Sequence, residues 1–422
     1  MPSLTIAPDG SHLLSEGHFF PYVADTAWSA FADATEAEWV HYLSYRSRQG
    51  FTSVAISVLP ILHDRTLRDG SREPFALDGA GHYDFARPDQ IYFDTARRFV
   101  ELAGAAGLRP TLVVLWCNYV EGTWGAARTP WAVMPADARR AYLTLVAETF
   151  GPLQPVLAIS GDDWFDAPAA IMTYLEELEQ LSVEAPDCLL TLHSGPVAQV
   201  PDEIADSPHL DFITYQSGHE IEHPDRCWTL AQRYRRRAVR KPVVNLEPVY
   251  ERHGYGGGLG RYTAADVRRA IWTSILAGAS AGFGYGAHGI WQWHREGGEF
   301  TSPAFSMEPF AWQSALQFRG GDDAALTAYV LQRHGLFRLD LAQQLLTDER
   351  GGFRAGAGDG VVAVFLPFAR EVRLLVDLSA HRCAAWDLEQ RTPIVPNVTD
   401  HHGQTVIRQL DVPGDALIVF ER

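Results

Sequence analysis

Two apolar runs of this sequence each deliver a carboxylate near the end of an expected strand. The run VLAISGDDW (residues 156–164) carries Asp162 and Asp163, and the run PVVNLEPVY (242–250) carries Glu247. Successive residues of a strand face opposite sides, so Asp162 and Glu247 both point away from the large apolar side chains of their runs. Two carboxylates that converge from different strands are the arrangement that hydrolysis of a glycosidic bond requires.

The choice between the two neighbouring aspartates rests on this strand parity. Asp162 lies on the face opposite Leu157 and Ile159, whereas Asp163 can instead cap a helix or pair with a cation. Glu247 could also be a structural carboxylate, but its place at a strand end favours catalysis, because catalytic residues of parallel barrels gather there. Asp162 and Glu247 are therefore the catalytic candidates.

These residues need a frame of strands whose ends meet. Eight apolar, β-rich runs alternate with patterned helical stretches, several of which end at a glycine. The runs cover residues 20–28, 51–59, 108–118, 155–163, 188–195, 210–218, 241–248 and 281–291. Eight such units in about 320 residues predict an α/β fold, a (β/α)8 barrel of the TIM type. An open doubly wound sheet would carry a GxGxxG turn after an early strand, and the sequence has none there.

Side-chain parity repeats around the expected ring. In the run 188–195, Thr191 and His193 share one face while Leu190 and Leu192 share the other. A narrow barrel lumen requires this pattern, with small or polar residues inside and bulky apolar residues outside.

The sequence predicts additional segments before and after the barrel. Residues 4–17 are typical of a hairpin around Asp9 and Gly10, which would close the barrel floor. From about position 345, short strands alternate with turn residues, which is typical of a small all-β sandwich. We therefore predict a catalytic barrel with an N-terminal hairpin over residues 1–344 and a β-sandwich domain over 345–422.

Polar and aromatic side chains gather at or just past the strand ends. A single histidine there is more often structural, and a single tryptophan is as often core as ligand contact. Several on one rim favour contacts to a sugar, whose apolar faces stack on aromatic rings while polar groups fix its orientation. The substrate-binding candidates are Trp28, Trp116, Asn118, Trp164, His193, Gln216, His219, Tyr250, His288 and Trp291. Two long, glycine-rich loops at residues 121–131 and 250–262 can form a lid.

Composition limits the partners that the chain can have. The 422 residues are 46% hydrophobic, enough for more than one domain, and their formal net charge is −17. Nucleic acid is not an expected partner, because the only basic cluster, residues 233–240, reads as a solvated helix face. The single lysine, Lys241, lies at the opposite end of its strand from Glu247, so Schiff-base and pyridoxal chemistry are excluded and no cofactor is expected.

No sequence feature predicts a metal site, a membrane anchor or an export signal. The four cysteines are scattered without a CxxC pair, which rules out a zinc ribbon and suggests no disulfide framework. The N-terminal segment has no basic stretch followed by an apolar run, and no segment approaches ~20 consecutive apolar residues. These observations predict a soluble, cytoplasmic protein, and they leave a homo-oligomer open.

Several motifs stand in the order found in one enzyme family. They are ADTAW (24–28), SGDD (160–163), TLHSG (191–195), ITYQSGH (213–219) and NLEPVYE (245–251), with longer matches at 74–96 and 268–291. In this order they resemble the apiosidase-like catalytic domain, glycoside hydrolase family 140 and its relatives. The closing segments AAWDLEQRTP and DVPGDALIVFE are similar to a small β-domain commonly fused behind that barrel, so the resemblance covers nearly the whole chain.

The resemblance implies a barrel in which the acid/base follows strand four and the nucleophile ends strand seven. These positions correspond to Asp162 and Glu247, the residues that parity also selects. The match at ADTAW implies that Asp25 binds a pair of sugar hydroxyls, although parity alone leaves its orientation open. The family commonly has two glycines before the aspartate, whereas Ser160 precedes Gly161 here and is expected to add a hydrogen bond near Asp162.

The leading interpretation is a retaining, exo-acting glycoside hydrolase that releases a terminal sugar. Glu247 would attack the anomeric carbon while Asp162 protonates the leaving oxygen and then deprotonates water, with the two carboxyl groups ~5–5.5 Å apart. One alternative is a carbohydrate-binding barrel without activity, which the presence of both carboxylates disfavours. The other is a metal-dependent hydrolase that uses the rim histidines, although the first strand lacks the His-x-His ligand pair of such barrels.

Overall fold

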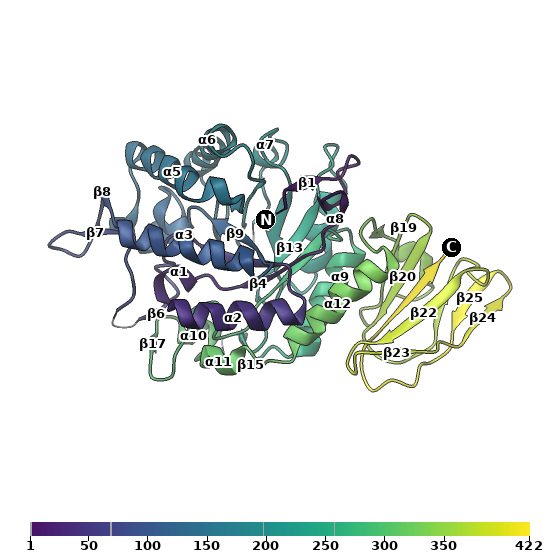
Figure 1. Ribbon diagram of the computed structural model, residues 1–422. Helices are drawn as coiled ribbons and strands as arrows, with labels where there is room; N and C mark the ends of the chain where they lie inside the picture. Colours follow the sequence, from purple (N-terminus) through teal and green to yellow (C-terminus); the bar gives the residue numbers. More distant parts are fainter. Residues whose placement is uncertain (1, 68–69, 197, 257) are drawn as a thin grey trace.

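The computed structural model describes residues 2–67, 70–196, 198–256 and 258–422 (Figure 1). Eight parallel strands form one sheet in the order β11-β10-β9-β5-β4-β16-β13-β12. They are β4 (Tyr22–Thr26), β5 (Ser53–Ser57), β9 (Arg109–Val113), β10 (Val156–Ala158), β11 (Leu190–Thr191), β12 (Ile213–Gln216), β13 (Val243–Glu247) and β16 (Gly282–Tyr285). Backbone N of Asp211 donates to Leu190 O (2.9 Å) and Thr191 Oγ1 to Phe212 O (2.9 Å), which joins β11 to the residues leading into β12. The ring therefore closes, and the predicted barrel is confirmed.

The strands of the barrel are buried along their whole length. Side chains fill the lumen on one side of each strand, and helices cover the other. Glycines in β16 allow the strands to approach closely where the lumen is narrow. A Cβ at Gly284 would lie 1.7 Å from the carbonyl oxygen of Leu246, so only glycine lets β16 pack this closely on the strand that ends at Glu247.

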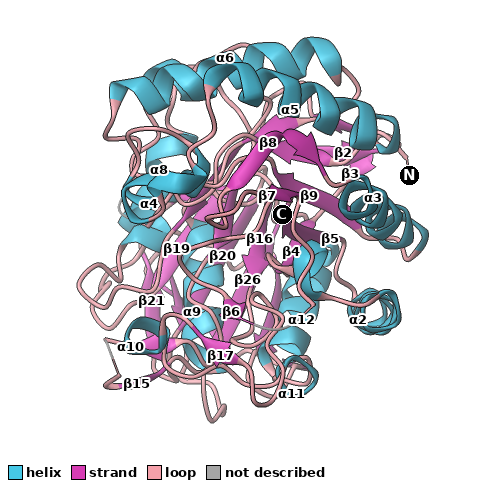
Figure 2. Ribbon diagram, turned by 90° about the vertical axis from the view of Figure 1, so that its left-hand side faces the viewer, coloured by secondary structure: helices cyan, strands magenta, loops and turns pink. Residues whose placement is uncertain are grey.

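Amphipathic helices cover the outside of the barrel (Figure 2). They include α2 (Glu36–Gln49), α3 (Gln90–Ala105), α5 (Ala136–Phe150), α6 (Pro168–Glu184), α8 (Arg226–Arg235), α9 (Ala264–Leu276) and α12 (Gly320–His334). Local sequence sets their ends. Thr35 and Glu38 form a capping box at the start of α2, and Gly50 ends that helix in the left-handed conformation with φ 94°. Among the described residues, no helix has both the length and the apolar content to cross a membrane.

The N-terminal segment forms the predicted hairpin. β1 (Leu4–Ile6) and β2 (Leu13–Ser15) pair antiparallel, and Gly10 in the connection has φ 68°. The guanidinium of Arg109, the first residue of β9, donates a hydrogen bond to the carbonyl of Pro2. The hairpin thus lies at the N-terminal ends of the barrel strands, at the end opposite Glu247.

The C-terminal residues form two antiparallel sheets. The larger has the order β18-β19-β20-β26-β22-β23, and the smaller has the order β21-β25-β24. Their bounds are β18 (Asp340–Leu341), β19 (Arg354–Gly358), β20 (Val361–Leu366), β21 (Val372–Leu374), β22 (Arg382–Asp387), β23 (Thr392–Ile394), β24 (Val398–His401), β25 (Gln404–Ile407) and β26 (Ala416–Glu421). Both sheets contribute to one buried cluster, with Leu366 and Ile418 from the larger and Leu374 and Ile407 from the smaller. The predicted sandwich is confirmed, and its larger sheet begins at Asp340, ahead of the predicted start at 345.

The larger C-terminal sheet packs against α9 (Figure 1), and Trp386 of β22 contacts His334 and Tyr329 of α12. Phe365 and Leu417 of this sheet belong to the same buried cluster as the barrel core. An ion-pair network reinforces the contact, because Arg268 of α9 lies 2.7 Å from both Asp323 of α12 and Asp415, which immediately precedes β26. The sandwich therefore shields one side of the barrel. It also buries the charge of Arg268, whose partners lie in the barrel domain (Asp323) and in the sandwich (Asp415).

Candidate active site

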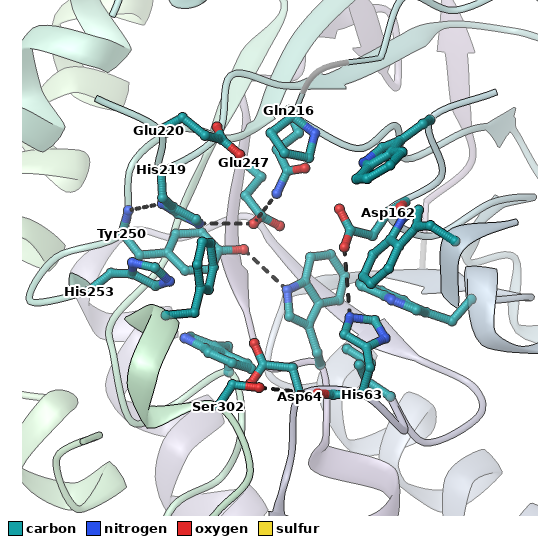
Figure 3. Close-up of a pocket in the computed structure, with 18 of the residues that line it drawn as sticks. His63, Asp64, Asp162, Gln216, His219, Glu220, Glu247, Tyr250, His253 and Ser302 are labelled. Carbon is teal, nitrogen blue, oxygen red and sulfur yellow. Dashed lines mark hydrogen bonds and ion pairs between the residues drawn. The ribbon is translucent and has the colours of Figure 1, made fainter. Parts of the chain in front are cut away.

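A cavity of about 290 Å³ lies at the C-terminal ends of the barrel strands (Figure 3). The segments that follow all eight strands contribute to its walls. They supply Trp28, Ile61, His63, Asp64, Trp116, Trp124, Arg128, Asp162, Trp164, Pro196, Gln216, His219, Glu220, Glu247, Tyr250, His253, Trp291, Ser302 and Phe305. Active sites of (β/α)8 barrels form at this end, because the loops after parallel strands converge there.

Glu247, the last residue of β13, is held by donors from the neighbouring strands. Its Oε1 accepts hydrogen bonds from Gln216 Nε2 and from His219 Nε2, the latter at 3.1 Å. Its Oε2 lies 3.2 Å from His193 Nε2. Burial alone would raise the pKa of Glu247, but the contacts to His193 and His219 outweigh it and hold this pKa well below its usual range. Glu247 is therefore ionised at neutral pH.

The tautomer of His219 follows from its second hydrogen bond. The backbone N–H of Tyr250 donates to His219 Nδ1 at 3.3 Å, so the ring nitrogen that faces Glu247 carries a proton. The hydroxyl of Tyr250 accepts from Trp28 Nε1 at 3.1 Å, which fixes a further cavity side chain beside the carboxylate. These contacts make the surroundings of Glu247 a set of donors.

Asp162 reaches the cavity from a loop and not from a strand. β10 ends at Ala158, and Asp162 has a left-handed backbone with φ 55°. The glycine before it is required by packing, because a Cβ at Gly161 would lie 2.3 Å from the ring of Trp116. Asp162 faces the cavity across from Glu247 (Figure 3), so parity selected a cavity residue even though its strand geometry does not extend that far.

The surroundings of Asp162 favour its protonated form. Burial raises its pKa well above the usual value, and the negative charges of Glu247, Glu220 and Asp64 raise it further. Within the described part of the chain, its Oδ1 makes no hydrogen bond. One cavity thus holds two carboxyl groups whose pKa values are displaced in opposite directions.

Asp163 and Ser160 occupy different places from Asp162. Asp163 is buried outside the cavity lining, and its Oδ1 accepts from the backbone N of Phe165 at 3.3 Å. The expectation that Ser160 forms a hydrogen bond near Asp162 needs correction. Its hydroxyl donates instead to the carbonyl oxygen of His193 at 3.0 Å, so Ser160 supports the histidine behind Glu247.

Most of the substrate-binding candidates line the cavity together with the two carboxyl groups. They are Trp28, Trp116, Trp164, Gln216, His219, Tyr250 and Trp291. Within the described residues, Trp116 Nε1, Trp291 Nε1 and Gln216 Oε1 are buried and have no hydrogen-bond partner. Buried polar atoms at a cavity wall are suited to bind hydroxyl groups of a ligand, since leaving them unpaired is costly.

Asp25 does not reach the cavity, contrary to what the resemblance implied. It is fully buried, and its Oδ2 accepts from Arg46 Nε at 2.5 Å and from Tyr42 Oη at 2.7 Å. Its Oδ1 accepts from the backbone N of Thr26 at 3.1 Å. The carboxylate is therefore used in an internal ion pair, because α2 places an arginine directly beside β4.

Three other candidates lie behind the cavity wall. His193 contacts Glu247 from the lumen side. Asn118 bonds to the ring of His63, with 2.9 Å between Oδ1 and Nδ1. His288 Nε2 lies 2.9 Å from the carbonyl oxygen of Met307, and burial lowers the pKa of this histidine to about 3. Each supports a cavity residue or a loop and does not itself line the cavity.

Several cavity residues were not predicted from the sequence. His63 and Asp64 lie four and five residues past the run 51–59, so a rule that examines the segments after strands could have found them. Burial raises the pKa of Asp64 to about 7, a contact with Ser302 opposes this, and the charge of Glu247 adds to it. Ser302 and Phe305 come from well beyond β16, and no sequence signal identifies them.

Aromatic rings form two pairs in the cavity wall. Trp28 and Trp116 meet edge to face with ring centroids 5.4 Å apart. Trp124 and Trp164 stack with centroids 5.6 Å apart and an interplanar angle of 23°. Such faces suit the apolar C–H surfaces of a sugar ring. Across the ranges that the structure describes, no three His, Cys, Asp or Glu side chains are arranged to hold a metal ion.

Comparison with known proteins agrees with this geometry. The family described as "Apiosidase-like, catalytic domain" matches residues 8–338. Comparison with curated proteins gives no match. A solved structure described as a glycoside hydrolase aligns with TM-score 0.80 and 18% identity over 100% of this chain and 97% of its own. A glycoside hydrolase family 5 structure from Bacteroides vulgatus aligns with TM-score 0.79 and 20% identity over 99% and 93%. A family 5 mannosidase from Rhizomucor miehei aligns with TM-score 0.54 and 12% identity over 79% and 99%. At these identities the structural likeness concerns the fold.

Proposed function

Because the chain belongs to the apiosidase-like family and is a glycoside hydrolase, we propose that it cleaves its carbohydrate substrate with retention and releases a terminal sugar. Glu247 serves as the nucleophile, and Asp162 serves as the acid and then the base. Family membership favours this reading over a barrel without activity and over a metal-dependent hydrolase.

One observation carries the proposal: the two carboxyl groups of the cavity have opposite protonation preferences. Retaining hydrolysis needs an ionised nucleophile and a protonated acid at the same pH. Donors around Glu247 keep its pKa low, whereas burial and neighbouring negative charges keep that of Asp162 high. Environments that push two titratable groups apart in this way indicate which is the base and which the acid.

The same electrostatics supports both steps of the reaction. Glu247 attacks the anomeric carbon, the bond from this carbon to the leaving oxygen breaks, and Asp162 transfers its proton to that oxygen. Glu247 is then an uncharged ester, which removes the negative charge that acts most strongly on Asp162. The pKa of Asp162 falls, so its carboxylate can take a proton from water as the water attacks the ester-linked carbon, while the bond from that carbon to the Glu247 oxygen breaks and restores the Glu247 carboxylate.

The size of the cavity supports exo action. A volume of about 290 Å³ is near the small end of the range of about 300–1,000 Å³ that is common for ligand pockets. Such a pocket suits one end of a chain better than an extended segment. An oligosaccharide labelled at its reducing end should at first lose only single sugars, so the first labelled product should be one sugar shorter than the substrate. Labelled fragments of mixed length at early times would refute exo action.

Azide rescue tests both assignments. Glu247→Ala and Asp162→Ala should each lose on the order of 10³-fold in turnover. With azide, Glu247→Ala should give a glycosyl azide of inverted anomeric configuration, because azide attacks from the side of the missing nucleophile. Asp162→Ala should give the azide with retained configuration, since the glycosyl-enzyme still forms. Retained configuration from Glu247→Ala, or full activity in either variant, would contradict the proposal.

Two narrower expectations from the sequence also remain proposals. Cytoplasmic location is tested by cell fractionation, and a homo-oligomer is tested by light scattering of the purified chain. The mechanism above requires neither, because every residue that it uses comes from one chain.

A further inference from the structure

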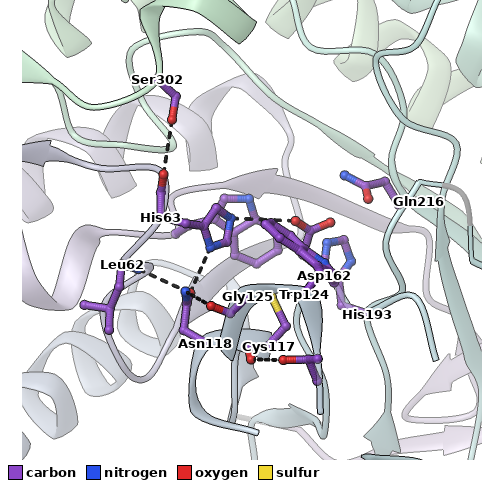
Figure 4. A network of polar contacts seen from close by, with 12 residues as sticks. Leu62, His63, Cys117, Asn118, Trp124, Gly125, Asp162, His193, Gln216 and Ser302 are labelled. Carbon is purple, nitrogen blue, oxygen red and sulfur yellow. Dashed lines mark hydrogen bonds and ion pairs between the residues drawn. The ribbon is translucent and has the colours of Figure 1, made fainter. Parts of the chain in front are cut away.

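A chain of hydrogen bonds leads from the third βα loop to the ring of His63 (Figure 4). Asn118 Nδ2 donates to Thr129 Oγ1 at 3.1 Å and to the carbonyl oxygen of Gly125 at 3.4 Å. Asn118 Oδ1 accepts from the backbone N of Leu62 at 3.3 Å. These contacts fix the orientation of the amide, so that its oxygen faces His63 Nδ1 at 2.9 Å.

The amide oxygen of Asn118 determines the tautomer of His63. This oxygen can only accept, so His63 Nδ1 must carry a proton and donate it. Burial lowers the pKa of His63 to about 4, which keeps the ring neutral at working pH. In a neutral ring with a proton on Nδ1, Nε2 carries a free lone pair. His63 Nε2 lies 3.8 Å from Asp162 Oδ2.

We infer that His63 is a positioning residue for Asp162: its unprotonated Nε2 offers a hydrogen-bond acceptor to the carboxyl group and so favours the protonated acid. This inference rests on the proposed role of Asp162. At 3.8 Å the bond is not yet formed, but catalytic hydrogen bonds of unliganded enzymes are often long and tighten when substrate binds. An acceptor beside a carboxyl group stabilises the neutral form and disfavours the ionised one.

Trp124 of α4 (Trp124–Arg128) holds the two groups of this pair in place. Its indole Nε1 donates to the backbone carbonyl of Asp162 at 2.7 Å. Its ring packs edge to face on the His63 imidazole, with centroids 4.5 Å apart. One aromatic side chain therefore fixes the distance between the acid and the imidazole.

The charged groups around the pair define the competing arrangement. Glu247 from β13, Glu220 after β12 and Asp64 after β5 face Asp162, and Asp163 adjoins it. Their negative charges would also favour a protonated His63 paired with an ionised Asp162. Burial of the imidazole and the positive charge of Arg128 on α4 oppose that arrangement. The two arrangements differ in where one proton resides, which can be measured.

Nuclear magnetic resonance of the unliganded protein tests the tautomer without any substrate. In protein labelled with ¹⁵N-histidine, the His63 signals are identified by their loss in His63→Gln. We expect a neutral ring protonated on Nδ1 from pH 5 to 8. Asn118→Asp should convert it to an imidazolium, because a carboxylate at that position stabilises a positive ring. An imidazolium, or a ring protonated on Nε2, in the wild-type protein at pH 6–7 would overturn the inference.

Leaving-group dependence tests the effect on the acid. In His63→Asn, the amide nitrogen can replace Nδ1 but nothing replaces Nε2, whereas the longer side chain in His63→Gln can place its oxygen near that position. On an aryl glycoside with a poor leaving group, His63→Asn should lose roughly tenfold in kcat/KM, and His63→Gln should recover much of it. On a dinitrophenyl glycoside, which needs little protonation, both should fall within about twofold of wild type. Equal losses on both substrates would mean a merely structural role.

Two control variants distinguish a failure of this inference from a failure of the proposed function. Asp162→Asn should show the same leaving-group dependence with a larger loss on the poor leaving group. If it does and His63→Asn does not, only the inference about His63 fails. If Asp162→Asn shows no such dependence, the acid role itself fails. His209→Asn changes an exposed histidine near the N-terminal end of β11, far from the cavity, and should match wild type on both substrates.

Discussion

Replacing His219 by phenylalanine should move the acidic limb of the pH–rate profile upwards. The acidic limb of kcat/KM reports ionisation of the nucleophile in the free enzyme. His219 Nε2 donates to Glu247 Oε1 at 3.1 Å and is one of the two histidines that lower the pKa of Glu247. Without it the ionised form loses a hydrogen bond while the burial of the carboxylate persists, so the pKa of Glu247 must rise.

The size of the shift follows from the strength of that bond. A hydrogen bond to a charged group contributes about 1.5–3 kcal/mol, and one pKa unit corresponds to about 1.4 kcal/mol. The acidic limb should therefore move up by roughly one to two pH units. The basic limb, which reports Asp162, should stay in place, because Glu247 remains ionised at that pH and still acts on it.

The assay measures kcat/KM from pH 9 down to the lowest pH at which each protein stays folded, for wild type, His219→Phe and the matched variant His219→Gln. The amide of His219→Gln can still donate near Oε1, so its acidic limb should lie close to that of wild type. Thermal melting of each variant controls for folding. An acidic limb that stays in place or moves down in His219→Phe would refute the electrostatic account of the nucleophile.

Three further predictions concern chemistry and stability. Activity should survive exhaustive treatment with EDTA, because no step of the mechanism needs a metal; loss on chelation with rescue by zinc or manganese would restore the metal-dependent alternative. Removal of residues 346–422 should lower the melting temperature or the soluble yield, because it exposes the face of α9 and leaves Arg268 without Asp415. The kcat of any folded fraction should stay near that of wild type. Normal stability with a collapsed kcat would place part of the site in the sandwich. Burial raises the pKa of Glu177 well above its usual value, so this side chain lowers stability as pH rises above the unfolded-state pKa of about 4.3. Glu177→Gln should therefore gain in free energy of unfolding at pH 8 relative to pH 4, measured with urea, and an equal change at both pH values would contradict this sign.

The barrel could be predicted because apolar runs of strand length recur at regular spacing with helices between them. The positions at which the strands end could not be predicted. The run 155–163 was expected to be extended throughout, but β10 ends at Ala158 while Ile159 is still fully buried. The regular ladder of β10 ends there, but pairing with the neighbouring strands continues irregularly, with isolated parallel bridges between Gly161 and Trp116 and between Asp163 and Ser194. Hydrophobicity indicates burial and not regular strand pairing. A prediction from hydrophobicity therefore makes strands too long where loops cover the rim of the barrel.

The residues of the candidate site likewise fall into those that the sequence could place and those that it could not. Residues at or just past a strand end, such as Glu247 and His219, could be placed in the cavity because all strand ends meet at one rim. Asp25 could not be excluded, since its partner Arg46 lies on α2, and the sequence alone does not show which side chain of that helix meets Asp25. The sequence gives the polarity of a side chain but not the identity of its neighbour across the barrel. Ser302 escapes prediction for the same reason, because a long excursion after β16 returns it to the cavity.

The order of strands explains why the two carboxyl groups differ. β12 lies beside β13, so residues at or after the ends of β11 and β12 surround Glu247, namely His193, Gln216 and His219. All three contact its oxygens through nitrogen atoms, and at least two of them donate protons. These neighbours stabilise the ionised form and make Glu247 suited to nucleophilic attack.

Asp162 follows β10 and is approached from the other side of the ring. Its neighbours there come after β5 and β9, namely His63 with its free lone pair and Trp124, which binds only its backbone. The carboxyl group thus meets an acceptor and negative charges, and all of them favour the protonated form. Residue type does not decide which carboxyl acts as acid, since aspartate and glutamate have similar intrinsic pKa values. The proposed roles follow from the strands that flank each position, with donors beside strand seven and an acceptor beside the loop after strand four.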